Sequence, residues 1–201
     1  MTGVDQTTEA PIPRRSSHGG PGPGCPVFLT GMMGAGKTTI APLLAAEWGV
    51  EWVDLDVRVA RIFGVGVAEL FARGEAHFRR CERDALKLLL AEPGLRLRTI
   101  VVATGGGLVV DPHNRATMRA AGRVVFLDVP VPELCRRLTT PEARAQRPLL
   151  SEDIEATRAR LEALSQRRRS AYEEADVVVD AGGSPQDAVC TVLAALREGS
   201  A

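Results

Sequence analysis

The sequence is poor in lysine and has no excess charge of either sign. Only Lys37 and Lys87 of its 25 basic residues are lysines, and the other 23 are arginines. Acidic residues also number 25, so the formal net charge is zero. Without a basic excess there is no overall electrostatic reason to bind nucleic acid, and we expect no such partner. Because arginine is the ordinary cation here, a single arginine indicates little about function, whereas a single lysine indicates more.

Cysteine pairs and long apolar runs are also lacking. The four cysteines (Cys25, Cys81, Cys135 and Cys190) lie more than 50 residues apart and form no Cys-x-x-Cys motif. This spacing argues against a zinc site or a disulfide framework and favours a reducing cytoplasm. No apolar run approaches the ~18 residues of a membrane-spanning helix, and residues 1–26 lack the apolar core of a secretory signal. We therefore expect a cytoplasmic protein without a membrane partner.

The chain divides into a tail and one domain. Residues 1–24 are rich in Pro, Gly, Ser and Thr, which predicts a disordered tail. In the remaining domain, 25–201, short apolar segments alternate with longer helical patterns. We expect strands at 27–30, 51–55, 99–103, 124–128 and 176–179, and helices at 37–48, 75–91, 112–121, 131–138, 151–172 and 185–197. Several strands are uniformly apolar, which predicts a five-stranded parallel sheet between two helical layers, an α/β fold of the three-layer α/β/α type.

A phosphate-binding loop follows the first expected strand. Residues 31–38 read GMMGAGKT and match G-x-x-x-x-G-K-[ST] in full. Glycines allow backbone N–H groups to surround a polyphosphate, and the next helix adds its positive end. Lys37 can reach the β- and γ-phosphates, and the Thr38 hydroxyl can ligate Mg²⁺. A glycine-rich turn is the alternative, but motif and context agree. The loop predicts a nucleoside triphosphate with Mg²⁺ and leaves the phosphoryl acceptor open.

Two further segments lie where parallel strands end, which is where such folds bind ligands. Asp54 and Asp56 close the expected strand 51–55, and alternation along a strand would put both carboxylates on one face. One would hold metal-bound water and the other would accept a hydrogen bond from an acceptor hydroxyl. The alternative is that Asp56 caps the next helix. Residues 105–107 are three successive glycines after strand 99–103, which removes side chains where a ligand would approach the backbone.

Arginine clusters complete the pattern. Arg79 lies in the first turns of helix 75–91, and Glu82 lies three residues later, where it can orient Arg79. Residues 136–147 hold four arginines (136, 137, 144 and 147) against one acid, and residues 167–169 are all arginine. In a chain this rich in arginine, each one alone is explained as a solvated surface side chain. Functional arginines would have to be paired by the fold.

In this order, the motifs resemble those of the shikimate kinase family. They are the loop 31–38, Asp54-x-Asp56, Gly74-Glu75 with Phe78-Arg79-Arg80 and Glu82, Gly105-Gly106-Gly107, Arg147-Pro148-Leu149-Leu150, and Arg168-x-x-x-Tyr172. The resemblance implies a P-loop fold of the nucleoside monophosphate kinase type, with a mobile lid at about 139–150. It implies that ATP phosphorylates shikimate to shikimate 3-phosphate, on the pathway to chorismate and the aromatic amino acids. It also implies a monomer.

The resemblance further implies residue roles. Catalysis would fall to Lys37, Asp56 and Arg147, with Asp56 as the base. The ATP site would comprise Gly34, Ala35, Gly36, Lys37, Thr38, Thr39, Arg137, Arg147 and Pro185, with Arg137 and Pro185 beside adenine. Shikimate would bind Asp56, Arg79, Gly105, Gly106, Gly107 and Arg168, with Arg79 and Arg168 on its carboxylate. Mg²⁺ would be held by Thr38 directly and by Asp54 through water. Apolar positions around the substrate would be Val67, Phe71, Phe78, Pro148 and Leu149.

Several alternatives remain open in the sequence. Nine residues separate Arg137 from Arg147, against the roughly six that we expect in the family's common form. The lid is therefore longer, and Arg136 competes with Arg137 for the adenine position. Ser170-Ala171 stand where the family often has Pro-Leu, so Arg167 or Arg169 could replace Arg168. Two rival functions are a kinase for a related cyclitol or sugar acid and a nucleotide-dependent regulatory module without phosphotransfer.

Overall fold

The computed structural model describes residues 24–140 and 154–198. The expected tail, apart from Gly24, lies outside the described residues. Positions 141–150 of the expected lid also lie outside, with Arg147, Pro148 and Leu149, and so does the start of the helix expected at 151–172. The account below concerns the described residues.

The strands form one parallel sheet of five, in the order β2-β3-β1-β4-β5. Their bounds are β1 Val27–Thr30, β2 Trp52–Asp54, β3 Val101–Ala103, β4 Arg123–Asp128 and β5 Val177–Asp180. The expected strands agree with these bounds to within two residues, and the prediction of a five-stranded parallel sheet is confirmed. All residues of β1 and β3 are buried, which explains why their sequences are uniformly apolar or nearly so.

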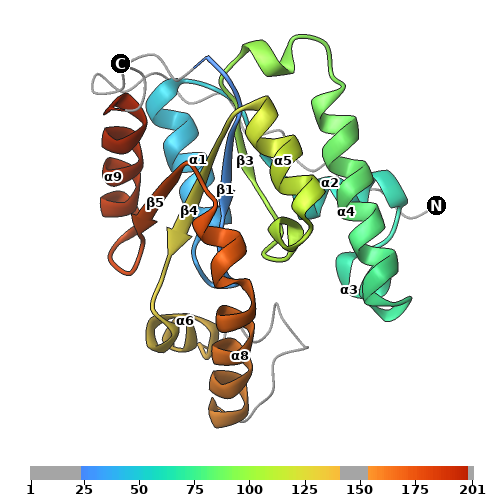
Figure 1. Ribbon diagram of the computed structural model, residues 1–201, viewed down its shortest axis with the longest axis vertical. Helices are drawn as coiled ribbons and strands as arrows, with labels where there is room; N and C mark the ends of the chain where they lie inside the picture. The colour runs from blue at the N-terminus through green and yellow to red at the C-terminus, as the bar shows by residue number, and fades with distance from the viewer. Residues whose placement is uncertain (1–23, 141–153, 199–201) are drawn as a thin grey trace, which may run out of the picture.

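Helices cover both faces of the sheet, which confirms the predicted three layers (Figure 1). Helices α1 and α9 pack against each other on one face, and α5 packs against β4 on the other. The helices are α1 Lys37–Trp48, α2 Leu55–Phe63, α3 Val67–Ala72, α4 Glu75–Leu90, α5 Pro112–Ala121, α6 Val131–Leu138, α8 Ile154–Glu173 and α9 Pro185–Glu198, with 3₁₀ turns η1 Leu95–Leu97 and η2 Leu108–Val110. None of the helices built from described residues has the length and apolar character needed to cross a bilayer.

The segment after β2 differs from the prediction. Asp54 ends the strand, and its side chain caps α2 by accepting hydrogen bonds from the N–H groups of Asp56 and Val57. Asp56 therefore lies in the first turn of α2. The expectation that Asp54 and Asp56 share a face through strand alternation is wrong. The helix is capped by Asp54 and not by Asp56. The hydrogen bonds that the Asp54 side chain accepts allow α2 to begin directly after the strand.

The parallel register brings the functional segments together. Leu29 of β1 pairs with Ala103 of β3 on one side and with Val125 of β4 on the other. Because all strands run in the same direction, their carboxyl ends meet at one edge. The loops that follow β1, β2 and β3 leave the sheet at this edge, which is the usual binding edge of an open α/β sheet.

Candidate active site

The phosphate-binding loop joins β1 to α1 and has the conformation that its glycines allow. Gly34 and Gly36 have φ of 81° and 91°, in the left-handed region that favours glycine. No side chain caps α1, and its first turn holds no acid, so the positive helix end is suited to an anion. Lys37 Nζ donates to the carbonyl oxygens of Gly31 (2.8 Å) and Met32 (2.9 Å), which places the ammonium group along the loop.

A short chain of hydrogen bonds links the loop to α2. Thr38 Oγ1 donates to Asp54 Oδ2 at 2.9 Å, and Asp54 Oδ1 accepts from the Asp56 N–H at 2.9 Å. The Asp56 Oδ1 atom is buried and has no hydrogen-bond partner among the described residues. Burial raises the pKa of Asp56, and the charge of Asp54 adds to this, while Lys37 and Arg79 act in the opposite direction. A buried carboxylate oxygen without a partner needs one, and a ligand hydroxyl can supply it.

Two of the three glycines, Gly105 and Gly107, leave space for charged side chains. A Cβ atom on Gly105 would collide with Glu82 Oε1 and would lie 2.9 Å from Asp56 Oδ1. A Cβ atom on Gly107 would overlap the guanidinium group of Arg79. Neither glycine has a positive φ, so the space they leave, rather than backbone conformation, explains their presence.

Arg79 is fixed by acids and aromatic rings. Its Nη1 donates to Glu82 Oε2 at 2.6 Å and its Nη2 to Glu75 Oε1 at 3.0 Å. Its guanidinium carbon lies 5.5 Å from the ring centroid of Phe71 and 5.4 Å from that of Phe78. The predicted pairing of Arg79 with Glu82 is confirmed. A guanidinium held on several sides presents a preformed cation beside the glycine loop.

The fold distinguishes the three consecutive arginines of α8. Arg168 Nη1 donates to the carbonyl oxygen of Gly106 at 3.2 Å, and the Tyr172 hydroxyl donates to the same oxygen at 2.5 Å. Arg169 instead pairs with carboxylates away from the glycine loop, and Arg167 contacts the backbone of its own helix. Of the three, Arg168 is therefore the one beside the glycine loop.

Glu82 is the most buried acid of this cluster. It is 1% exposed, and its Oε1 has no hydrogen-bond partner among the residues described. Its pKa is raised to about 7, mainly by burial and also by the nearby charge of Asp56, against the lowering effect of Arg79. Arg168 is close enough to lower it. Two acids and two arginines thus surround the glycine loop.

Glu82 gives the folded protein a pH-dependent stability. The folded protein holds this proton up to about pH 7, whereas the ordinary value is 4.5. Between these values the folded state binds more protons than the unfolded state, so Glu82 makes the free energy of unfolding fall as pH rises. We expect Glu82→Gln, which cannot titrate, to remove this contribution. Urea unfolding of both proteins at about pH 4.5 and about pH 7 measures it, and an unchanged pH dependence in the variant would contradict the assignment.

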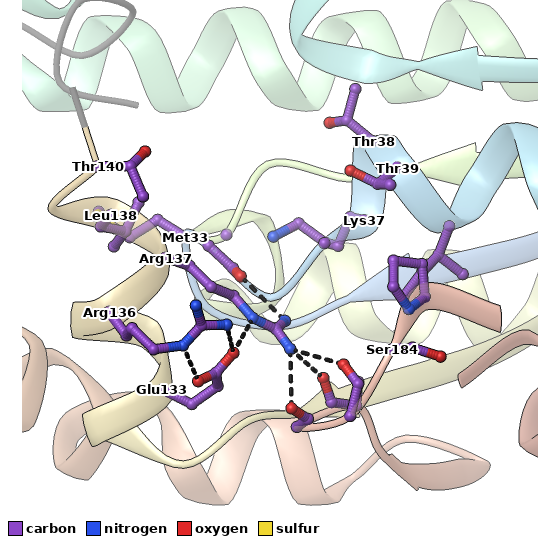
Figure 2. Close-up of a pocket in the computed structure, with 18 of the residues that line it drawn as sticks. Met33, Lys37, Thr38, Thr39, Glu133, Arg136, Arg137, Leu138, Thr140 and Ser184 are labelled. Carbon is purple, nitrogen blue, oxygen red and sulfur yellow. Dashed lines mark hydrogen bonds and ion pairs between the residues drawn. The ribbon is translucent and has the colours of Figure 1, made fainter. Parts of the chain in front are cut away.

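A cavity of about 840 Å³ opens above the phosphate-binding loop. Figure 2 shows Lys37 and Thr38 on one side of it and the side chains of α6 on the other. It is lined by Lys37, Thr38, Thr39, Asp54, Asp56 and Gly106, and by a second group from α6, Thr140 and the loop before α9, called here the far end: Glu133, Arg136, Arg137, Thr140, Pro185 and residues 181–184. Arg137 also contacts the phosphate-binding loop, because its Nη1 donates to the carbonyl oxygen of Gly34 at 3.5 Å. Arg79, Gly105, Gly107 and Arg168 do not line this cavity and lie around the glycine loop. The site therefore has two parts, which meet at Asp56 and Gly106.

The two candidate arginines at the far end of the cavity differ in their contacts. Arg137 Nη2 donates to the carbonyl oxygens of Ala181, Gly182 and Gly183 at 2.9, 3.0 and 3.0 Å. Arg137 thereby connects α6 to the loop that precedes Pro185. The Arg136 side chain is 73% exposed and donates hydrogen bonds to Glu133. Of the two, Arg137 is the one held across the cavity.

Glu133 is a site residue that the sequence reasoning missed. Its carboxylate accepts hydrogen bonds from both Arg136 and Arg137, which lowers its pKa to about 2. The signal was present in the sequence, because Glu133 precedes these arginines by three and four residues in a predicted helix. It was missed because the arginines alone were considered as ligands.

Comparison with known proteins identifies the family. A family model of shikimate kinase matches residues 33–197. A shikimate kinase of Synechococcus elongatus is 40% identical over 173 residues, which cover 85% of each chain. The crystal structure of the shikimate kinase of Bacteroides thetaiotaomicron has a TM-score of 0.76 at 32% identity, covering 87% of this chain and 97% of that one. The Acinetobacter baumannii enzyme in complex with shikimate has a TM-score of 0.76 at 30% identity, covering 87% and 94%. The chain belongs to the shikimate kinase family.

Proposed function

We propose that this kinase transfers the γ-phosphoryl group of Mg–ATP to the 3-hydroxyl of shikimate, a step towards chorismate and the aromatic amino acids. One observation carries the assignment of the site. The unpartnered carboxylate oxygen of Asp56 lies where the cavity above the phosphate-binding loop meets the glycine loop. On the far side of that loop stand two arginines, Arg79 and Arg168. An acceptor with hydroxyls and a carboxylate fits this arrangement.

The carboxylate of shikimate is assigned to Arg79 and Arg168. Two guanidinium groups on one planar anion make charge-assisted hydrogen bonds with defined geometry. Gly105, Gly106 and Gly107 form the backbone wall of this part of the site. A side chain on Gly105 or Gly107 would displace the charged groups around it, and one on Gly106 would press against the backbone of the phosphate-binding loop. Phe71 and Phe78, which lie beside Arg79, supply an apolar neighbourhood that strengthens the ionic contact.

Asp56 is assigned as the general base. Its raised pKa brings it closer to the value at which a carboxylate accepts a proton readily at neutral pH. The acceptor oxygen forms a bond to the γ-phosphorus while the bond from that phosphorus to the bridging oxygen of ADP breaks. The acceptor proton passes to Asp56 Oδ1. Lys37 would turn from its carbonyl partners, Gly31 and Met32, to the phosphate oxygens.

The remaining assignments concern the nucleotide and its metal ion. Thr38 would bind Mg²⁺ directly and Asp54 through water, since both present the oxygen atoms that Mg²⁺ prefers. In the described part of the chain no group of three or more His, Cys, Asp or Glu side chains could hold a metal alone, so phosphate oxygens would complete the coordination. When bound, Mg²⁺ offsets phosphate charge. We assign the binding of the phosphates to Gly34, Ala35, Gly36 and Thr39. We assign the contacts with adenine to Arg137 and Pro185. Arg147, which lies outside the described residues, is assigned to the closing lid.

A panel of acceptors tests the proposed function. ADP release would be measured on the full chain with Mg–ATP and shikimate, an aminated shikimate, gluconate or a neutral polyol. We expect the highest kcat/KM for shikimate and no turnover of the neutral polyol, because the paired arginines require a carboxylate. Faster turnover of gluconate would contradict the acceptor assignment. Nucleotide binding without turnover of any acceptor would contradict phosphotransfer.

The glycine loop provides a further expected result. Gly107→Ala should raise the KM for shikimate by about tenfold or more, a cost of at least about 1.4 kcal/mol, because the added methyl group displaces Arg79. Affinity for Mg–ADP should not change. Gly66→Ala is a matched control, since Gly66 has a φ of −67° and open space around its Cβ position. Equal effects of the two substitutions would refute the steric argument.

We also infer that the enzyme works as a monomer in the cytoplasm. All four cysteines are unpaired, which suits a reducing compartment. Light scattering on the purified full chain, with and without Mg–ADP and shikimate, tests the monomer. A dimeric mass under either condition would overturn it.

A further inference from the structure

Glu133 lies in the first turn of α6, at the far end of the cavity from Asp56. Its Oε1 accepts from Arg137 Nε at 2.7 Å and from Arg136 Nη2 at 2.7 Å, and its Oε2 accepts from Arg136 Nε at 2.7 Å. The side chain is 21% exposed. Figure 2 shows the carboxylate between the two guanidinium groups. One acid therefore fixes both arginines that line this end of the cavity.

Arg137 is held at both ends of its guanidinium group. Its Nε is bound to Glu133, and its Nη2 donates to three successive carbonyl oxygens of residues 181–183. Its Nη1 makes a longer contact, 3.5 Å, with the carbonyl oxygen of Gly34 in the phosphate-binding loop. These carbonyls belong to the loop between β5 and α9, which continues into Pro185. Arginine loses much rotamer freedom when it is fixed in this way. Because Glu133 already holds Arg137 in the folded protein, this entropy is lost on folding and not when a nucleotide binds.

We propose that Glu133 is a positioning residue for the nucleotide. It acts through Arg137, which it holds against the loop 181–184 so that α6 and this loop form a preformed wall beside Pro185. The proposal rests on the proposed function, in which Arg137 and Pro185 flank adenine.

The direction of the effect separates positioning from simple electrostatics. ATP and ADP are anions, and a carboxylate in their cavity repels them. If Glu133 acted only by its charge, its removal would tighten nucleotide binding. If it acts by holding Arg137, removal weakens binding although a negative charge has been lost. The two explanations thus predict changes of opposite sign.

Glu133→Gln tests this prediction. Glutamine keeps the length of the side chain, but it offers one acceptor oxygen and no charge to two guanidinium groups. We expect the Kd for Mg–ADP, measured by calorimetry on the full chain, and the KM for ATP to rise about tenfold. The KM for shikimate should change by less than about twofold. Glu51→Gln is the matched control, because it removes an exposed carboxylate paired with an arginine, Arg98, where β2 begins; it should change none of these values.

A double-mutant cycle tests the route through Arg137. In an Arg137→Ala background, Glu133→Gln should add no further loss of nucleotide affinity, because the residue that it positions is gone. Additive losses would overturn the proposal, as would an unchanged or tighter Kd in Glu133→Gln. A parallel rise in both KM values with a lower Tm would also overturn it, since it would indicate a structural role alone. The calorimetry needs no acceptor, so its outcome is independent of whether shikimate is the substrate.

Discussion

Asp56→Asn is expected to lower kcat for shikimate phosphorylation by a factor of about 10²–10⁴, the range of general acid–base catalysis. The amide has the same shape and keeps one acceptor oxygen, so it still accepts a hydrogen bond from the acceptor hydroxyl. It cannot take the proton, which the carboxylate Oδ1 is free to do in this structure. The loss should therefore appear mainly in kcat, with a smaller change in the KM for shikimate.

Two measurements accompany the Asp56→Asn assay. The Kd for Mg–ADP should remain close to that of the wild type, because the nucleotide end of the cavity is untouched. The Tm should not fall and is expected to rise, because burial and the neighbouring Asp54 make an ionised Asp56 unfavourable in the folded state. A turnover rate equal to that of the wild type would show that Asp56 is not the base.

Arg168→Ala is expected to raise the KM for shikimate by about 30-fold or more. Removing one partner of a buried, hydrogen-bonded charge pair costs on the order of 2–5 kcal/mol, and about 30-fold is the lower end of that range. The substitution also removes one of the two groups that donate to the Gly106 carbonyl oxygen. The KM for ATP should change little, because Arg168 does not line the nucleotide cavity.

Arg167→Ala is the matched control for Arg168→Ala. It removes the same chemical group one residue away, where the side chain contacts its own helix. Its KM for shikimate should equal that of the wild type. Arg168→Lys should give an intermediate value, because an ammonium group keeps the charge but lacks the planar fork. A raised KM in Arg167→Ala together with a normal KM in Arg168→Ala would reassign the carboxylate contact to Arg167.

The sheet and the phosphate-binding loop were predictable because their signals are local. Residues 27–38 hold an apolar strand followed by glycines, lysine and threonine. These twelve residues are enough to predict a strand, a phosphate-binding loop and a nucleotide ligand. The helices α2 and α3 were missed because they are short and separated by Gly64 and Gly66. An N-cap and a strand end look alike in Asp54-x-Asp56, so the sequence predicts strand alternation at the point where α2 begins.

The contacts that distinguish one arginine from its neighbours are not local. Arg168 and Gly106 are 62 residues apart, and which of three successive arginines meets the glycine loop depends on the rotation of α8. Glu82 lies beside Gly105 because α4 packs against η2, the turn that follows the glycine loop. Arg137 meets the loop 181–183 across 44 to 46 residues. Side-chain pairing at such separations is set by packing, which sequence patterns do not specify.

The crowding around the glycine loop also constrains how the acceptor range of this enzyme can be redesigned. Libraries that vary Gly105 or Gly107 would mostly yield inactive proteins, because any side chain there collides with Glu82 or Arg79 before it reaches a new acceptor. Variation belongs instead at Val67, which is only partly buried against the core; Phe71 should be kept, because its ring contacts Arg79. Directed evolution towards other carboxylated polyols is best confined to the short helix α3. The glycines and the charged side chains beside them should be left unchanged.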